Sequence, residues 1–169
     1  SSREFAFHND MSFLDDDQVP YYFTLGCTRN YERAATLLAD PLDALNSLDE
    51  NTTDLLRAPL FRLCHTYNRG QAAERTSEKI SPIITPEGEV QLGVNVKPGT
   101  TEGADALGQF RNLLGQTAIA HVLEPGEVLI VPNRFFVHAR TSFQMANNAS
   151  ERRWIQRTNI KKRKASPTA

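Results

Sequence analysis

Short apolar segments of β type, separated by turn residues, constrain the fold of this chain more than any other feature. Each segment is rich in aromatic, β-branched or other apolar residues, and Pro, Gly, Asn or Asp residues lie between the segments. They occupy residues 5–7, 21–27, 61–65, 121–123, 128–131, 135–138 and 154–160. Many short strands joined by turns are typical of a jelly roll or a barrel-like β architecture.

Helices are expected between some of these strands. Asp40 is a suitable N-cap for Pro41 at the first helical position, and leucines then recur at helical spacing as far as Leu48. A short helix is expected over about residues 52–57, and a longer one over 101–114, where apolar residues cluster on one helical face. The sequence therefore predicts a mainly β fold with flanking helices, which excludes a pure sandwich.

Two further segments have other patterns. Residues 66–79 lose all apolar periodicity, which predicts a mobile surface loop. Residues 82–96 resemble a hairpin, because apolar residues lie on both sides of a Pro-Glu-Gly turn at residues 86–88.

The size and charge of the chain exclude several classes of function. With 169 residues, 40% of them hydrophobic and 23% charged, it has the composition of one globular domain. Lys and Arg number 19 and Asp and Glu 20, so the net charge of −1 gives no reason to expect a nucleic-acid or membrane partner. No apolar stretch approaches the roughly 20 residues that span a bilayer. The expected partner is a small molecule.

We expect residues 1–160 to form this domain and the basic residues 161–169 to form a flexible tail. Cys27 and Cys64 lie in apolar segments without a CxxC pattern. This arrangement is typical of reduced, buried thiols, so a cytoplasmic location is expected.

His8 and Asp10 form an HxD triplet at the end of the first predicted strand. Residues i and i+2 of a strand point to the same face, so one metal ion can contact both side chains. Such a triplet also arises by chance at ordinary strand ends. His138 closes another predicted strand and offers a third ligand. Two histidines and one carboxylate leave three open positions on an octahedral metal, which suits iron(II) oxygen chemistry.

Arg153 and Arg157 lie on either side of Trp154 and Ile155 at the start of the last predicted strand. An arginine fork binds a carboxylate through two parallel hydrogen bonds, as a dicarboxylate bound inside a barrel requires at its far end. A charged strand edge explains the same residues, and taken alone they leave both interpretations open.

Separated blocks of the sequence resemble, in order, the motifs of one family of oxygenases. The blocks are FHNDMSF (7–13), YFTLGCTR with RAAT (22–29 and 33–36), EPGEVLIVPNRFFVHARTSF (124–143) and RWIQR (153–157). The family is the clavaminate-synthase-like branch of the 2-oxoglutarate-dependent oxygenases, within the taurine dioxygenase superfamily. The resemblance covers nearly the whole chain. Within the family, it is nearest to hydroxylases of free or carrier-tethered amino acids, such as arginine, asparagine or lysine.

The resemblance implies that His8, Asp10 and His138 are the iron(II) ligands of a facial triad. Asp10 departs from the branch, which usually has glutamate here, although aspartate is common in the wider superfamily. Both side chains ligate through oxygen, so the departure affects placement within the superfamily rather than metal binding. The carboxylate also argues against halogenation, because related halogenases have a small residue at this position.

The resemblance also implies a site for the cosubstrate 2-oxoglutarate. Thr36 matches the family's threonine near the keto-acid end, and Arg153 matches the arginine that clamps the distal carboxylate. Arg157 matches a second arginine that lies near the substrate or cosubstrate carboxylate in amino-acid hydroxylases. Arg152 adjoins Arg153, so either of these two neighbours can be the clamp.

The fold that the resemblance implies is a double-stranded β-helix, a cupin-like jelly roll with helices packed outside. The implied reaction uses iron(II), 2-oxoglutarate and O2 to hydroxylate an unactivated carbon of a small substrate, expected to be an amino acid of secondary metabolism. One alternative is an oxygenase of the same superfamily that acts on a sulfonate or another non-amino-acid. The other is a cupin-like binding barrel without catalysis. Because the family has a substantial segment before the HxD motif, we expect a missing N-terminal segment or a second chain to complete the barrel.

Overall fold

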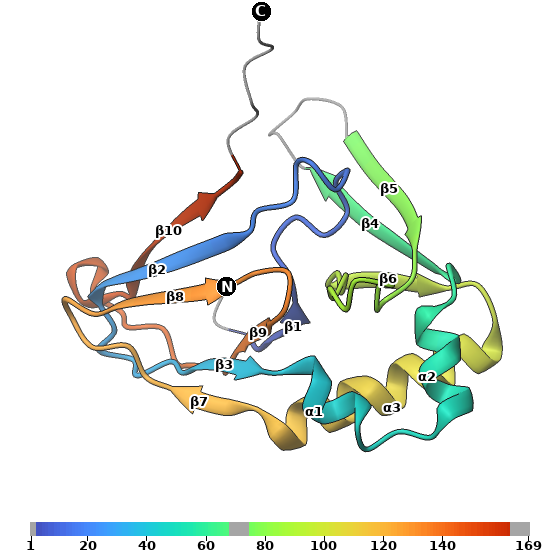
Figure 1. Ribbon diagram of the computed structural model, residues 1–169. Coiled ribbons are helices and arrows are strands. Elements are labelled where there is room, and N and C mark those ends of the chain that lie inside the picture. The colour runs from blue at the N-terminus through green and yellow to red at the C-terminus, as the bar shows by residue number, and fades with distance from the viewer. Residues whose placement is uncertain (1–2, 68–74, 163–169) are drawn as a thin grey trace, which may run out of the picture.

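The computed structural model describes residues 3–67 and 75–162, and within these ranges the chain is mainly antiparallel β-sheet with helices at one end (Figure 1). The strands are β1 (Phe5–His8), β2 (Tyr22–Arg29), β3 (Thr36–Ala39), β4 (Phe61–Tyr67), β5 (Arg75–Ser81), β6 (Asn95–Pro98), β7 (Ile119–His121), β8 (Val128–Pro132), β9 (Val137–Arg140) and β10 (Trp154–Ile160). The helices are α1 (Pro41–Leu45), α2 (Glu50–Arg57), α3 (Thr101–Thr117) and the short 3-10 helix η1 (Ala149–Glu151). The predicted mainly β fold with flanking helices is therefore confirmed.

The strands form three sheets, with the orders β1-β9-β3-β7, β10-β2-β8 and β5-β4-β6. In Figure 1 the first two sheets lie on one side of the molecule, and the third lies on the other side above α2 and α3. Strands distant in sequence become neighbours in the first sheet, because β1 from the start of the chain pairs with β9 from its last third. This pairing determines the position of the functional site.

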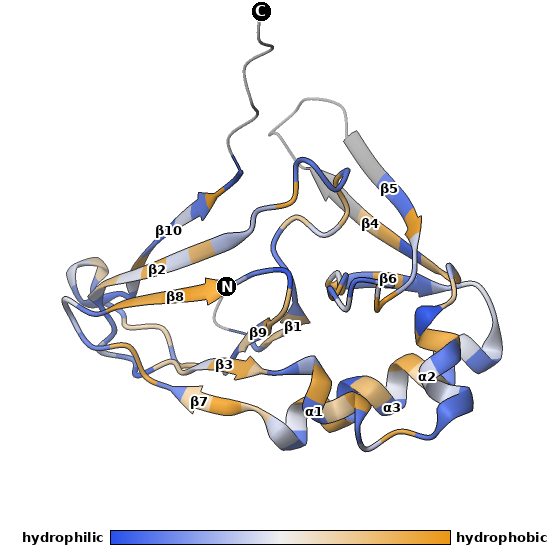
Figure 2. Cartoon of the chain, viewed as in Figure 1, coloured by the Kyte–Doolittle hydropathy of each residue, from blue (hydrophilic) through white to orange (hydrophobic). Residues whose placement is uncertain are grey.

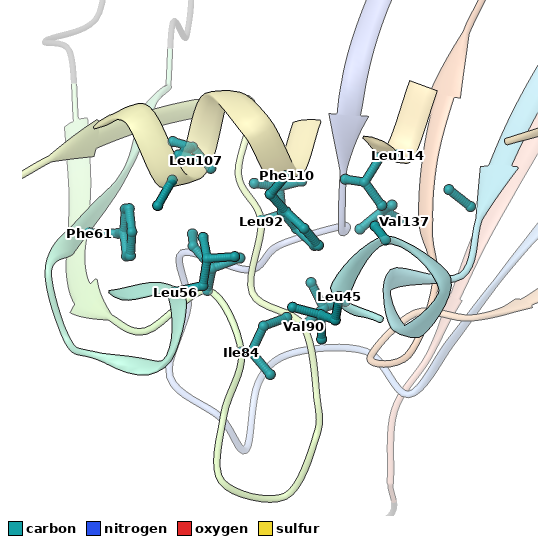
Figure 3. Close-up of a cluster of buried hydrophobic side chains, with 14 residues drawn as sticks. Leu45, Leu56, Phe61, Ile84, Val90, Leu92, Leu107, Phe110, Leu114 and Val137 are labelled. Atoms are coloured by element: carbon teal, nitrogen blue, oxygen red, sulfur yellow. The ribbon is translucent and has the colours of Figure 1, made fainter. Parts of the chain in front are cut away.

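The larger hydrophobic core lies between α3 and the segments that it covers (Figure 3). The predicted apolar face of α3 is buried, and Phe110 at its centre is 0% exposed. It packs in one cluster with Leu56 of α2, Phe61 of β4, Val137 of β9 and Leu92, which lies in the segment before β6. The core thus joins the third sheet to the sheet that carries β1 and β9.

Replacing Phe110 by alanine is expected to lower the free energy of unfolding by about 3–5 kcal/mol, because the change removes a fully buried ring and leaves a cavity. Urea denaturation followed by circular dichroism measures the change. Phe135→Ala is the matched control, since that ring is 49% exposed, and its effect should stay below about 1 kcal/mol. Equal losses in both variants would contradict this account of the core.

The structure differs from the sequence-based expectation at a predicted helix and at a predicted loop. The helix that starts after Asp40 ends at Leu45 rather than Leu48. The predicted loop over residues 66–79 is wrong, because β5 pairs with β4 along its whole length. β5 is an edge strand with a largely polar sequence, held by main-chain pairing and by contacts such as the 2.8 Å ion pair of Arg62 and Glu78. Such a strand needs no apolar alternation. Residues 68–74 of that prediction lie outside the described residues.

The hairpin predicted over residues 82–96 is confirmed only at its turn, since the ladder is reduced to one bridge between Ile84 and Val90. Gly88 closes the turn with a φ of 79°, which favours glycine. The predicted tail from residue 161 lies mostly outside the described residues. No helix in the described part of the chain is long and apolar enough to cross a membrane. Cys27 is buried as expected, whereas Cys64 is partly exposed, and both are free thiols.

Candidate metal centre

The pairing of β1 with β9 brings two predicted metal ligands together. His8 is the last residue of β1, and His138 lies directly opposite it on β9. The centroids of the two imidazole rings are 4.1 Å apart. His138 is the second residue of its strand rather than the last, because β9 begins at Val137. Both side chains are buried, and β9 lies inside the sheet with β3 on its other side.

Asp10 completes the group from the turn that follows β1. Its Oδ1 atom lies 3.6 Å from Nε2 of His8 and 3.8 Å from Nε2 of His138. One ligand atom from each of the three residues can be chosen so that all lie within 4.8 Å of one another. The described residues contain no other such group of three His, Cys, Asp or Glu side chains. The three residues that the sequence singled out are thus in one place.

The protonation states of this group favour a bound cation. Burial, followed by the electrostatic influence of the neighbouring His8, lowers the pKa of His138 to about 3, so its imidazole is neutral. Burial alone would raise the pKa of Asp10, but the close approach of His8 and the charge of Arg157 outweigh it and hold that pKa below its usual value. Nδ1 of His8 lies 2.9 Å from the carbonyl oxygen of Ala6 and donates to it, which leaves the lone pair on Nε2.

Several polar atoms of the group have no hydrogen-bond partner among the described residues. They are both ring nitrogens of His138 and Oδ2 of Asp10. Buried polar atoms without a partner are costly and rare, so each calls for an explanation. A divalent cation would accept lone pairs from both side chains at once. The residues therefore fit a metal ion, and their type suits iron(II).

A cavity of about 130 Å³ opens on the His138 side of the group. Its lining includes Thr36 from the start of β3, together with Arg153, which directly precedes β10, and Arg157 in the middle of β10. We call it the Thr36 cavity. The structure thus places the predicted cosubstrate residues around one space that also reaches His138. Arg152 does not line this cavity; it is exposed, and its Nε atom donates to the carbonyl oxygen of Ala146.

Arg153 offers a buried positive charge that suits an anionic ligand. Its Nε atom is buried and has no hydrogen-bond partner among the described residues. Burial, then the nearby charge of Arg140, lowers its pKa, but a guanidinium remains charged at neutral pH. The main-chain N–H of Arg153 donates to Oε1 of Glu32 at 3.1 Å, which fixes the position of Arg153 directly before β10.

A second cavity of about 360 Å³ also adjoins the group. It is lined by His8, Asp10 and the loop that follows, including Met11, and we call it the Met11 cavity. Arg157 lines both cavities, and its Nη1 atom donates to Oδ1 of Asp10 at 2.7 Å. Its guanidinium carbon also lies 5.7 Å from the centroid of the Phe23 ring. The candidate metal centre therefore borders two cavities.

Comparison with known proteins decides the family. A family model described as taurine catabolism dioxygenase TauD, TfdA family matches residues 1–159. The chain belongs to the TauD/TfdA family. It is 32% identical over 160 residues to L-asparagine oxygenase of Streptomyces coelicolor, an alignment covering 90% of this chain and 46% of that protein. It is 26% identical over 162 residues to clavaminate synthase 2 of Streptomyces clavuligerus, covering 92% and 49%.

The fold of this TauD/TfdA chain also matches a solved relative. A crystal structure of asparagine oxygenase, in complex with Fe(II), (2S,3S)-3-hydroxyasparagine and succinate, superposes with a TM-score of 0.79 at 29% identity. The match covers 95% of this chain and 51% of that one. The resemblance seen in the sequence motifs is thereby confirmed at the level of the family. The chain spans about half the length of the curated relatives that it matches.

Sequence reasoning missed two groups of residues that support the site in this TauD/TfdA chain. Asn133 is fully buried and contacts the main chain of Asp10. Arg134 forms an ion pair with Glu89 at 2.9 Å and donates to the carbonyl oxygen of Val19, so it fixes the loop that leads from the metal centre to β2. The polar Asn-Arg pair between two apolar segments was the only signal, and it indicates an ordinary turn equally well.

Proposed function

We propose that this chain carries the metal and cosubstrate site of an iron(II)- and 2-oxoglutarate-dependent dioxygenase. The proposed enzyme hydroxylates an unactivated carbon of a small substrate, a free or carrier-tethered L-amino acid, with O2. The observation that carries the proposal is the meeting of His8, Asp10 and His138 beside a cavity lined by Thr36 and Arg153. Membership of the TauD/TfdA family supports it.

In this proposal His8, Asp10 and His138 hold the metal. Nε2 of His8 is presented by the hydrogen bond of Nδ1 to the main chain, and burial keeps His138 neutral and able to donate its lone pair. Iron(II) bound there, with 2-oxoglutarate, would supply the oxygen activation that no side chain can perform. The protein's contribution would be to hold the three ligand side chains beside the two cavities.

Thr36 and Arg153 are the proposed cosubstrate residues. 2-Oxoglutarate is a dianion, and the Thr36 cavity is lined by three arginines, Arg140, Arg153 and Arg157. The cavity of about 130 Å³ suits a small acid rather than a large substrate. Arg153 offers the buried Nε–H as a donor, and a carboxylate would give that atom the partner that it lacks in the described residues.

The proposed substrate site is the Met11 cavity, which has the larger volume. Arg157 is proposed to orient the substrate carboxylate, because its side chain is 44% exposed and only Nη1 is occupied by Asp10. The solved asparagine oxygenase holds a hydroxylated amino acid and succinate, which supports an amino-acid substrate for this chain.

A panel of free amino acids and sulfonates, assayed for substrate-dependent succinate formation, tests the substrate class. We expect turnover with an L-amino acid and little with a sulfonate such as taurine. Turnover with the sulfonate alone would assign the chain to another kind of superfamily oxygenase. Metal binding without any turnover across the panel would instead favour a binding barrel without catalysis.

We further propose that the sheets form part of a double-stranded β-helix that another polypeptide segment or a second chain completes. The support is an apolar face on the β10-β2-β8 sheet. The register places Tyr22, Val128, Ile130 and Ile160 on this face, and they are 45%, 62%, 62% and 45% exposed. Figure 2 shows β8 among the most hydrophobic strands. An exposed apolar face of this kind is typical of a surface that another polypeptide segment covers.

A cytoplasmic location remains a prediction.

A further inference from the structure

A single buried amide holds the main chain of Asp10 at both of its polar groups. Asn133 is 0% exposed and follows β8 directly. Its Oδ1 atom accepts a hydrogen bond from the N–H of Asp10 at 2.8 Å, and its Nδ2 atom donates to the carbonyl oxygen of Asp10 at 3.0 Å. The same Nδ2 donates to the carbonyl oxygen of Pro20 at 3.0 Å. The side-chain amide of Asn133 thus bonds both the N–H and the C=O of Asp10.

Asp10 needs such a contact because no strand holds it. His8 and His138 are fixed by the β1-β9 ladder, in which they are direct partners, whereas Asp10 lies beyond the end of β1 in a turn. The next residue, Met11, has a φ of 59°, so the chain reverses immediately after Asp10. Without the Asn133 amide, the buried N–H and C=O of Asp10 would lack these bonds, and the main chain that carries the Asp10 carboxylate would no longer be held in place.

A second buried amide anchors Asn133 to the same turn. Nδ2 of Asn9 donates to the carbonyl oxygens of Asn133 and Phe136, at 2.5 and 2.8 Å. Oδ1 of Asn9 accepts from the N–H of Leu92 at 2.9 Å, which ties the turn to the main hydrophobic core. The two amides therefore connect the end of β1, the end of β8 and the start of β9. A satisfied buried network of this kind is rigid.

We infer that Asn133 is a positioning residue for the metal centre: it supplies to Asp10, through the main chain, the alignment that the strand ladder supplies to the two histidines. The inference rests on the proposed function, since it assumes that Asp10 is a metal ligand. Asn133 does not act on the reacting atoms. Its role is to keep the carboxylate within reach of the metal while the two imidazoles are held independently.

The chain contains a closely matched control in Asn30. This buried residue, 5% exposed, accepts from the N–H of Ala34 at 3.1 Å and donates to the carbonyl oxygen of Ala34 at 3.1 Å. It also donates to the carbonyl oxygen of Leu123 at 3.1 Å. Asn30→Ala and Asn133→Ala thus each remove three hydrogen bonds of a buried amide, one that it accepts and two that it donates. Only Asn133 contacts a proposed metal ligand.

The test is a titration of the 169-residue chain with cobalt(II), an air-stable probe whose visible absorption reports ligand geometry. Thermal unfolding is measured in parallel. We expect Asn133→Ala to raise the Kd for cobalt(II) by about 10-fold and to change the absorption spectrum of the bound ion. We expect Asn30→Ala to shift the Kd by less than about 2-fold and to leave the spectrum unchanged, with a comparable fall in Tm.

Equal effects of the two variants on Kd and spectrum would overturn the inference, because stability alone would then explain them. An unchanged Kd in Asn133→Ala would also overturn it. If Asn133→Ala does not fold, Asn133→Ser replaces it, since the hydroxyl is too short to reach both groups of Asp10 and the same weakening is expected. Absence of cobalt(II) binding by the unmodified chain would instead overturn the proposed function, so the two failures are distinguishable.

Discussion

Replacing His138 by alanine is expected to weaken iron(II) binding by more than about 100-fold. The change removes one of three ligands, and loss of a group that merely supports a ligand already costs about 10–100-fold. His138 is also the group member whose two ring nitrogens have no hydrogen-bond partner among the described residues, so its replacement removes no protein hydrogen bond of the side chain. Anaerobic equilibrium dialysis with iron(II), followed by metal analysis, measures the Kd.

His121→Ala is the control for this prediction. His121 is exposed, its Nε2 atom lies 3.1 Å from Oε2 of Glu127, and it is not a member of the group of three. Its removal should leave the iron(II) Kd within about 2-fold of the original value. Unchanged iron(II) binding in His138→Ala, or equal weakening in both variants, would contradict the assignment of the metal centre.

Replacing Arg153 by glutamine is expected to weaken 2-oxoglutarate binding by about 30-fold or more. A hydrogen bond between charged groups contributes about 1.5–3 kcal/mol, and 2 kcal/mol corresponds to about 30-fold in Kd. The glutamine retains a polar side chain of moderate length but removes the charge. Isothermal titration with 2-oxoglutarate in the presence of manganese(II), which replaces iron(II) without reacting with O2, measures the Kd.

Arg152→Gln provides a direct contrast, because the two arginines are neighbours in sequence and differ in position. Arg153 lines the Thr36 cavity, whereas Arg152 lies at the surface. The Arg152 variant should bind 2-oxoglutarate almost as well as the unmodified chain. A larger loss in Arg152→Gln than in Arg153→Gln would move the clamp by one residue and contradict this account.

Elements with a clear apolar pattern could be predicted from the sequence, whether that pattern is buried, as in α3, or largely exposed, as in β10. β10 was expected over residues 154–160 and begins and ends there, and the apolar face of α3 is the buried face. β5 could not be predicted in this way, because an edge strand with one neighbour is held by its main chain and needs no apolar alternation. The predicted loop thus failed for a physical reason.

At the candidate site, the residue types could be predicted, but the arrangement of the spaces could not. The HxD spacing indicated that His8 and Asp10 share a face. The order of the motifs, which resembles that of the family, indicated that His138 and Arg153 belong to the same site. Nothing in the sequence indicated that Arg157 would contact Asp10 and line two cavities. Those contacts depend on which strands become neighbours, and that is determined by tertiary pairing over most of the chain length.

The positioning residue was hidden for a related reason. An asparagine between Pro132 and Arg134 is typical of a turn, and its sequence context does not show that it is fully buried. Only the fold reveals that its amide meets the main chain of Asp10, a residue far away in sequence. Turn-forming residues next to predicted ligands thus merit inspection as anchors.

The most direct test of the central claim is an anaerobic titration of the chain with iron(II) and 2-oxoglutarate, followed by visible absorption. We expect a weak metal-to-ligand charge-transfer band that requires both additions and is lost in His138→Ala. A chain that shows no such band, or a band that persists in His138→Ala, would contradict the claim that His8, Asp10 and His138 hold iron beside a 2-oxoglutarate site.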